Sequence, residues 1–158
     1  MKALTIWQPW ASLIMMGAKP WEWRGWPMPN WMRLRPCVIH AGARPVRPAE
    51  IAELIEDLHH GDTSLKGDIA LPFLRNTARA SYPLSAGLGT VIFGTPIPAA
   101  EWAAIHDKPG LDSDRIDHNK WAWPVTDIKP FFQPIPCRGA QGFWNWPEAG
   151  IEPFNAPR

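Results

Sequence analysis

The chain has 158 residues, enough for one domain with its own core, and a formal net charge of +1. It contains no apolar run long enough to cross a bilayer and no signal-peptide pattern, so we expect a cytoplasmic protein with no membrane partner. The 19 prolines predict short strands joined by long ordered loops. A core rarely needs as many as 11 tryptophans, so some of these rings are expected to line a surface that binds something flat.

The charge is unevenly distributed along the chain. Residues 1–47 carry seven Lys or Arg and one acid, whereas residues 48–158 carry nine basic and fourteen acidic residues. A basic segment interleaved with tryptophan is typical of single-stranded nucleic-acid binding, because charge holds phosphates and rings stack on bases. The alternative is a chance asymmetry that the fold disperses over its surface.

Short strands and helices are predicted in turn along the chain. Periodicity and end signals predict helices at 8–16, 48–60 and 99–106, and strands at 2–6, 17–24, 37–41, 88–95, 120–127, 131–136 and 142–146. We expect residues 25–36 to form an irregular loop over the barrel or its cleft, and residues 62–87 a long connection that could hold one helical turn. A single domain is predicted over 1–154, followed by a loose tail at 155–158.

The most informative stretch is Gly-Ala-Lys-Pro-Trp-Glu-Trp-Arg at 17–24. Its glycine and proline end the preceding helix, after which a strand period of two places Lys19 on the opposite side of the pleat from Glu22 and Arg24. Three ionisable residues at a helix–strand junction are candidates to line a cleft. The alternative is an ion-pair cluster that only fixes the structure of that junction.

This G-x-K-x-x-E-x-R pattern, preceded by Gln-Pro-Trp-Ala at 8–11, resembles the ASCH domain, a family of the PUA-like superfamily of small β-barrels. Further stretches agree with the family in order along the chain, at 38–41, 88–91 and 141–145. The resemblance implies an α+β fold, a small PUA-like β-barrel with two or more flanking helices. It also implies that a cleft binds RNA or a nucleotide-like ligand and is lined by Lys19, Glu22 and Arg24.

One branch of the family is known for hydrolysing acylated cytidine such as N4-acetylcytidine, with a lysine, a threonine three residues later and a distant glutamate. Lys19 matches that lysine, but Glu22 stands at the threonine position and residues 89–95 contain no acid. Other ASCH proteins are reported to cleave RNA. The candidate catalytic residues of an amidohydrolase or ribonuclease are therefore Lys19, which would activate water or the substrate amide, and Glu22, its proton partner.

The charge state of Lys19 has two possible outcomes. In a dry cleft beside Arg24, desolvation and like charge would lower the pKa of Lys19, and the neutral amine could act as a base or nucleophile. If Glu22 pairs with Lys19 instead, the effect reverses and the side chain stays a cation that binds phosphate or carbonyl oxygen.

Five further residues are candidates for ligand contacts: Trp7, Gln8, Trp10, His40 and Arg44. One of the two tryptophans is expected in the core and the other on the ligand, and His40 could instead be a satisfied core histidine. His40 and the cysteine three residues before it lack a second metal-binding pair, so no metal is predicted. No nucleophile elbow, phosphate-binding glycine loop or dinucleotide fingerprint is present, and we expect no cofactor.

Three functions remain open. The favoured one is a monomeric domain that binds RNA or a modified nucleotide, for which Lys19→Ala would weaken affinity modestly and binding would fall with salt. A hydrolase would lose turnover on Lys19→Ala but keep ligand binding. A protein-interaction module would show neither behaviour, and would form a stable complex with a protein partner.

Overall fold

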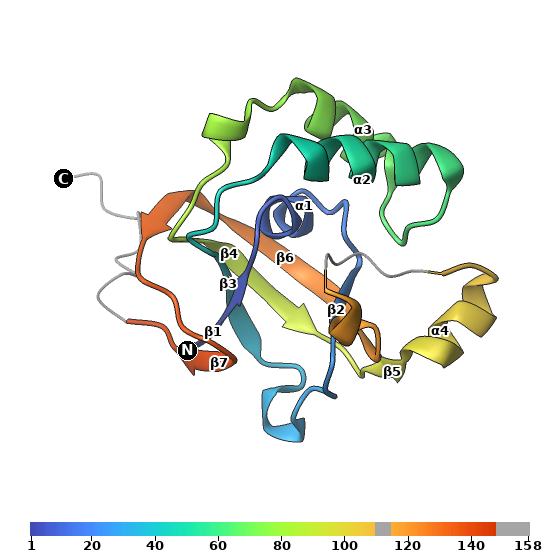
Figure 1. Ribbon diagram of the computed structural model, residues 1–158. Helices are drawn as coiled ribbons and strands as arrows, with labels where there is room; N and C mark the ends of the chain where they lie inside the picture. The colour runs from blue at the N-terminus through green and yellow to red at the C-terminus, as the bar shows by residue number, and fades with distance from the viewer. Residues whose placement is uncertain (110–114, 148–158) are drawn as a thin grey trace.

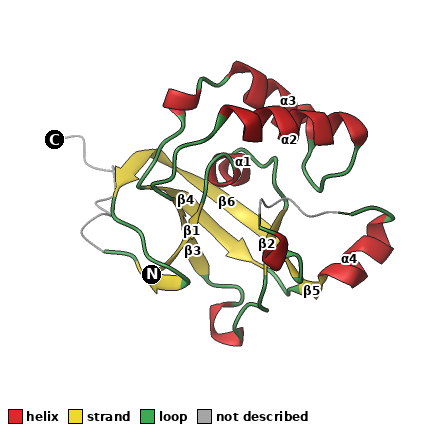
Figure 2. Cartoon of the chain, in the orientation of Figure 1, coloured by secondary structure: helices red, strands yellow, loops and turns green. Residues whose placement is uncertain are grey.

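The computed structural model describes residues 1–109 and 115–147, so the predicted tail at 155–158 lies outside the described residues. The described residues form an α+β fold in which helices flank a curled mixed sheet, as the sequence predicts (Figures 1 and 2). In this part of the chain, no helix is both long and apolar enough to span a membrane.

The sheet contains strands β1 (Lys2–Ile6), β2 (Trp21–Arg24), β3 (Pro36–Ala41), β4 (Ala86–Phe93), β5 (Ile97–Pro98), β6 (Trp121–Pro136) and β7 (Phe143–Asn145). The order across it is β2-β6-β4-β3-β1-β7, with β5 paired to β6. The β1–β3 pair is parallel and the other pairs are antiparallel. The curl brings the two end strands together, since Trp26, just after β2, meets Phe143 of β7 with ring centroids 5.8 Å apart.

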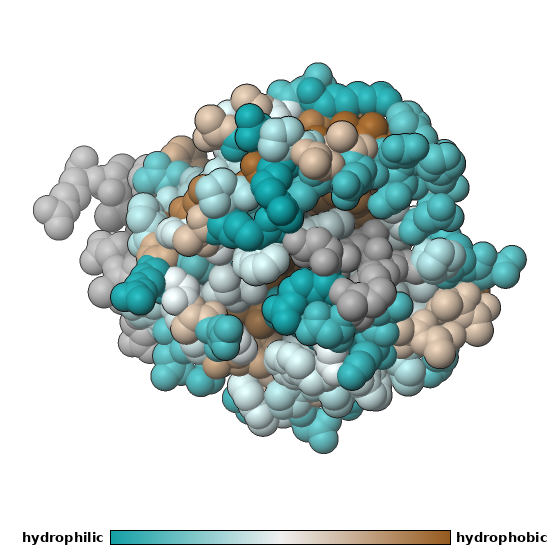
Figure 3. Space-filling model, in the orientation of Figure 1, coloured by the Kyte–Doolittle hydropathy of each residue, from teal (hydrophilic) through white to brown (hydrophobic). Residues whose placement is uncertain are grey.

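The helices are α1 (Trp10–Met15), α2 (Pro48–His60), α3 (Gly67–Asn76) and α4 (Ala99–His106), with short 3-10 turns η1 (Asn30–Met32), η2 (Arg79–Ser81) and η3 (Ile116–His118). Helices α2 and α3 lie side by side, and α1 lies between this pair and the sheet (Figure 1). Hydrophilic side chains cover much of α2 and α3, with brown apolar atoms visible between them (Figure 3).

Two predictions about the elements are wrong. Residues 67–76 form helix α3 where a connection with at most one turn was expected. Ala70 and Leu74 bury an apolar face of this helix, which stays continuous although Pro72 lies inside it. The runs at 120–127 and 131–136 form one strand, β6, instead of two. Irregularities in its pairing with β4, and a positive φ of 48° at Asp127, let this proline-rich strand bend without ending.

Candidate functional site

A cleft of about 440 Å³ opens where the ends of β1 and β2 face η3 and the loop between β6 and β7. Its size is within the range of small-molecule sites. The lining residues are Thr5, Ile6, Trp7, Trp10, Glu22, Trp23, Arg24, Gly25, Trp26, Arg115, Asp117, His118, Ala140, Gln141 and Gly142. The cleft thus gathers four separate segments of the chain around the carboxyl end of β2.

Lys19 lies before β2 instead of within it, because residues 17–20 wrap around the end of α1. Its backbone N–H donates to the carbonyl of Leu13 in that helix (3.2 Å). The side chain is 1% exposed, and Nζ donates to the carbonyl of Trp21 (2.6 Å) and to Oε2 of Glu22 (2.9 Å). The prediction of opposite sides is therefore wrong: Lys19 and Glu22 form a buried ion pair, and Lys19 is not among the residues that line the cleft.

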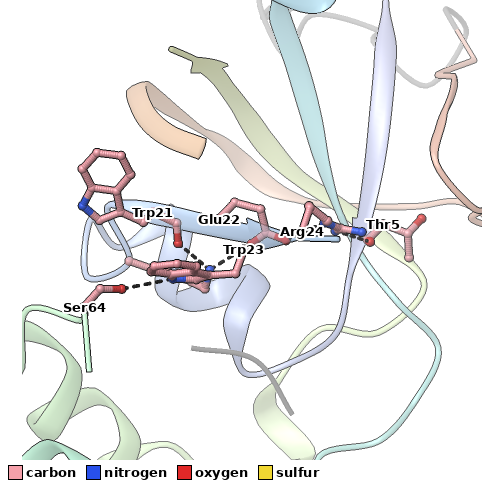
Figure 4. Close-up of polar contacts among 7 residues, drawn as sticks. Thr5, Trp21, Glu22, Trp23, Arg24 and Ser64 are labelled. Atoms are coloured by element: carbon pink, nitrogen blue, oxygen red, sulfur yellow. Dashed lines mark hydrogen bonds and ion pairs between the residues drawn. The ribbon is translucent and has the colours of Figure 1, made fainter. Parts of the chain in front are cut away.

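Glu22 and Arg24 share one side of β2, as the strand period predicts, and both line the cleft. Arg24 donates from Nε to Oε1 of Glu22 (2.9 Å) and from Nη2 to the carbonyl of Thr5 in β1 (3.3 Å) (Figure 4). Burial alone would raise the pKa of Glu22, but the charges and hydrogen bonds of Lys19 and Arg24 outweigh it and hold that pKa below its ordinary value. The cleft floor therefore holds a fixed carboxylate and a guanidinium.

Four tryptophans line the cleft: Trp7, Trp10, Trp26 and the almost fully buried Trp23. Trp10 is partly buried and packs against two core clusters, whereas Trp7 is 38% exposed, and both line the cleft. The guanidinium of Arg44 lies 4.1 Å from the Trp7 ring centroid, and Arg44 donates to Oε1 of Glu50 at 2.6 Å. Arg44 therefore contacts a wall of the cleft from behind and is not one of the lining residues.

The other two predicted ligand residues, Gln8 and His40, are buried and are not among the lining residues. Gln8 accepts a hydrogen bond from the Ser12 N–H (3.0 Å) and donates to the carbonyl of Pro83 (2.9 Å), which fixes the start of α1. The Nε2 of His40 lies 2.7 Å from the carbonyl oxygen of Cys137, and burial lowers its pKa. Both side chains have internal partners that account for their positions.

Sequence reasoning missed the contribution of η3, which places Arg115, Asp117 and His118 at the cleft. Gly25 allows this approach, since a Cβ there would lie 2.6 Å from the carbonyl oxygen of Asp117. Burial, followed by the positive charges of Arg24 and Arg115, lowers the pKa of His118, so its imidazole is mainly neutral at neutral pH. No pattern within 107–119 connects this segment with β2, so only the fold could have revealed it.

No metal site is evident within residues 1–109 and 115–147, where no three His, Cys, Asp or Glu side chains cluster. Cys37 and Cys137 are free thiols, of which Cys37 is buried and Cys137 is half-buried. Burial raises the pKa of Cys37 to about 12, so this thiol is unreactive at neutral pH. The chemistry of the cleft rests on the carboxylate, guanidinium, imidazole and indole groups described above.

Comparison with solved structures finds crystal structures of the ASCH protein from Zymomonas mobilis and of two mutant forms of it. Each alignment has 14% sequence identity and covers 85% of this chain. The TM-score is 0.47 for the first mutant, 0.47 for the ASCH protein itself and 0.45 for the second mutant. The alignments cover 74%, 72% and 72% of those chains, in the same order. No protein-family model and no curated protein sequence matches this chain.

Proposed function

We propose that the cleft binds a nucleotide, either within RNA or as a modified nucleotide, with its base between tryptophan rings and its polar edge at Arg24 and Glu22. The observation that carries this proposal is the fixed Glu22–Arg24 pair on the floor of a cleft with four tryptophans in its lining. An acceptor and a donor side by side suit the mixed hydrogen-bonding edge of a base, and indole rings suit its faces.

Burial of the ion pair supports recognition of a defined ligand. The Arg24 side chain is 13% exposed and that of Glu22 is 6% exposed, so both groups keep one geometry without a ligand. Arg24 uses Nε for Glu22 and Nη2 for Thr5, and a guanidinium has five N–H donors, which leaves donors for a carbonyl or phosphate oxygen. Such preorganisation lowers the entropic cost of binding.

Lys19 has an indirect part in this proposal. Its ammonium lies behind Glu22 and donates to that carboxylate, so it positions the acceptor and does not touch the ligand. This geometry favours the second of the two alternatives for Lys19, in which the side chain is a cation paired with Glu22. The modest effect expected of Lys19→Ala on affinity would then arise through Glu22.

The test is fluorescence anisotropy with a labelled single-stranded RNA, comparing the wild type with Arg24→Gln and Arg75→Gln. Both variants remove one positive charge, but Arg75 is exposed on α3 and lies outside the cleft lining. We expect Arg24→Gln to weaken binding by about 10- to 100-fold, the loss typical of a hydrogen bond to a charged group, and Arg75→Gln to have little effect. Equal affinity of the wild type and Arg24→Gln would overturn the proposal. Failure of the wild type to bind RNA or nucleotides would do the same and favour a protein-interaction module.

A hydrolase acting on a modified nucleoside is the second candidate, and the observation that favours it is His118. A mainly neutral imidazole that shares the cleft lining with Glu22 could accept a proton from an attacking water. In this version Glu22 and His118, not Lys19, would contact the ligand.

The hydrolase candidate is tested by incubating N4-acetylcytidine with the protein and separating the products by chromatography with mass detection. The wild type would yield cytidine and acetate, and His118→Gln would yield neither product. Unchanged substrate at high wild-type concentration would contradict this candidate for that nucleoside.

A further inference from the structure

The loop after β2 divides its large apolar side chains between the core and the surface. Met28 and Met32 are buried in the main core, whereas Trp26 and Trp31 are 36% and 51% exposed. Two prolines in this loop restrict its backbone, and the methionines fix it from below. The loop therefore holds two large rings at the surface in a defined position, and only the first of them lines the cleft.

The two exposed rings are joined by Phe143 of β7. Its ring centroid lies 5.8 Å from that of Trp26 and 5.6 Å from that of Trp31, with edge-to-face geometry in both contacts. Beneath it, Trp123 is stacked on Phe143 at 5.9 Å with an interplanar angle of 13°. A supported row of aromatic rings thus leads from the cleft to Trp31, across the seam between the end strands of the sheet. In Figure 1 the light-blue loop that carries η1 lies at the same end of the sheet as β7.

Positive charge accompanies this row. The ammonium of Lys2 lies 5.8 Å from the Trp31 ring centroid and donates to Oδ1 of Asn145 (2.7 Å), which is a neutral partner. Arg33 and Arg35 lie two and four residues after Trp31 in the chain, and Arg35 is exposed. Exposed aromatic rings beside cations suit a nucleic-acid strand, because the ring stacks on a base while the cation holds a phosphate.

We propose that Trp31 and Lys2 form a second nucleotide subsite, which binds a neighbour of the nucleotide held in the cleft. The natural ligand is then a single strand longer than one nucleotide, not a free nucleoside. This inference rests on the proposed function of the cleft and extends it along Trp26, Phe143 and Trp31. The Lys2 ammonium beside the ring favours RNA over an apolar protein segment as the occupant.

The test compares a labelled single-stranded RNA hexanucleotide, followed by anisotropy, with a nucleoside monophosphate used as a competitor. Trp31→Ala is expected to weaken hexanucleotide binding by about 5- to 150-fold, the usual effect of losing one stacked base. It should leave the inhibition constant of the monophosphate unchanged. Phe132→Ala is the control, since Phe132 is an aromatic residue, 79% exposed, that lines neither the cleft nor the row. Thermal unfolding of each variant checks that the fold is intact.

The outcomes separate the two proposals. If the wild type binds both ligands but Trp31→Ala binds the hexanucleotide as tightly as the wild type does, the second subsite is wrong and the cleft proposal stands. Equal losses for the hexanucleotide and the monophosphate would also overturn the subsite, because Trp31 would then act through the cleft. If the wild type binds neither ligand, both proposals fail. If RNA does not bind and a partner protein binds in a way that Trp31→Ala abolishes, the occupant of this surface is that protein and the RNA subsite is wrong.

Discussion

At the scale of single residues, the described contacts place the motif lysine behind the cleft and the acid and arginine inside it. Lys19, Glu22 and Arg24 form one chain of ion pairs, with both N–O distances at 2.9 Å. The strand period correctly predicted the shared side of Glu22 and Arg24. The same period failed for Lys19 because this residue lies before β2, where the backbone is still hydrogen-bonded to the end of α1 and is not extended as in a strand.

Lys19→Met tests the structural weight of the buried ion pair. Removing one partner of a buried ion pair typically costs about 3–5 kcal/mol. Because Arg24 would still pair with Glu22, we expect a loss at the lower end of this range, about 3 kcal/mol in the free energy of unfolding. Urea denaturation measures this loss. Lys66→Met is the matched control, because Lys66 is exposed and its replacement should change stability by about 0.5 kcal/mol or less. Equal stability of both variants would contradict a structural role for Lys19.

The lowered pKa of Glu22 predicts how its contribution depends on pH. A carboxyl whose folded-state pKa is below its ordinary value of 4.5 stabilises the fold above that pH, and this stabilisation is lost as pH falls through the folded-state pKa. The stability difference between the wild type and Glu22→Gln should therefore be constant near neutral pH and shrink below 4.5. Urea denaturation across this range measures it. If the stability difference between the wild type and Glu22→Gln grew as the pH fell, the pKa of Glu22 would not be lowered in the folded state and the prediction would be wrong.

At the scale of elements, the cleft depends on the close approach of η3 to the end of β2. Gly25→Ala should push η3 away, because the new Cβ would lie 2.6 Å from a backbone oxygen of Asp117. We expect a stability loss of about 1–3 kcal/mol, typical of overpacking, together with weaker RNA binding. Gly67→Ala is the control, since its Cβ would meet nothing closer than 4.0 Å. Fluorescence anisotropy with RNA compares the two variants. If Gly25→Ala binds RNA as tightly as the wild type does, η3 does not contribute to the RNA site.

The elements that sequence predicted best have clear end signals or strong apolar runs. Helix α2 begins at Pro48 and ends before Gly61, as predicted, and β1 has its predicted bounds. Helix α3 was missed because a proline, Pro72, lies within its sequence, which argues against a helix. Its apolar face is buried by packing with residues of α1 and α2, and this tertiary contact cannot be read from the sequence. In the same way, Trp7, Trp10, Glu22 and Arg24 could be assigned to the cleft from local motifs. The residues of η3 could not, because the link between η3 and β2 is a tertiary contact.

At the scale of the whole molecule, the curl of the sheet makes the site. The end strands β2 and β7 are far apart in sequence and meet through Trp26 and Phe143, so the cleft and the aromatic row lie along one seam. The formal net charge of +1 gives little general attraction for polyanions. The proposed RNA binding therefore requires a few local cations around the seam.

This distribution predicts a shallow salt dependence. We assume that Arg24, Arg115 and Lys2 are the cations that contact the RNA strand. Each phosphate contact on a single strand contributes about −0.7 to the slope of log affinity against log salt concentration. The three contacts together therefore predict a slope of about −2. Lys2→Gln should reduce the magnitude of the slope by about 0.7. Anisotropy titrations over a range of salt concentrations measure it. A flat plot would contradict phosphate recognition.

The most direct measurement is an NMR titration of the ¹⁵N-labelled tryptophan indole signals with a single-stranded RNA hexanucleotide. The cleft proposal predicts that the signals of Trp7, Trp10 and Trp26 shift as RNA is added. The signals of Trp102 and Trp146, which are buried in separate clusters outside the cleft, should stay in place. Shifts that spare Trp7, Trp10 and Trp26, or no shifts at millimolar RNA, would contradict a nucleotide site in the cleft.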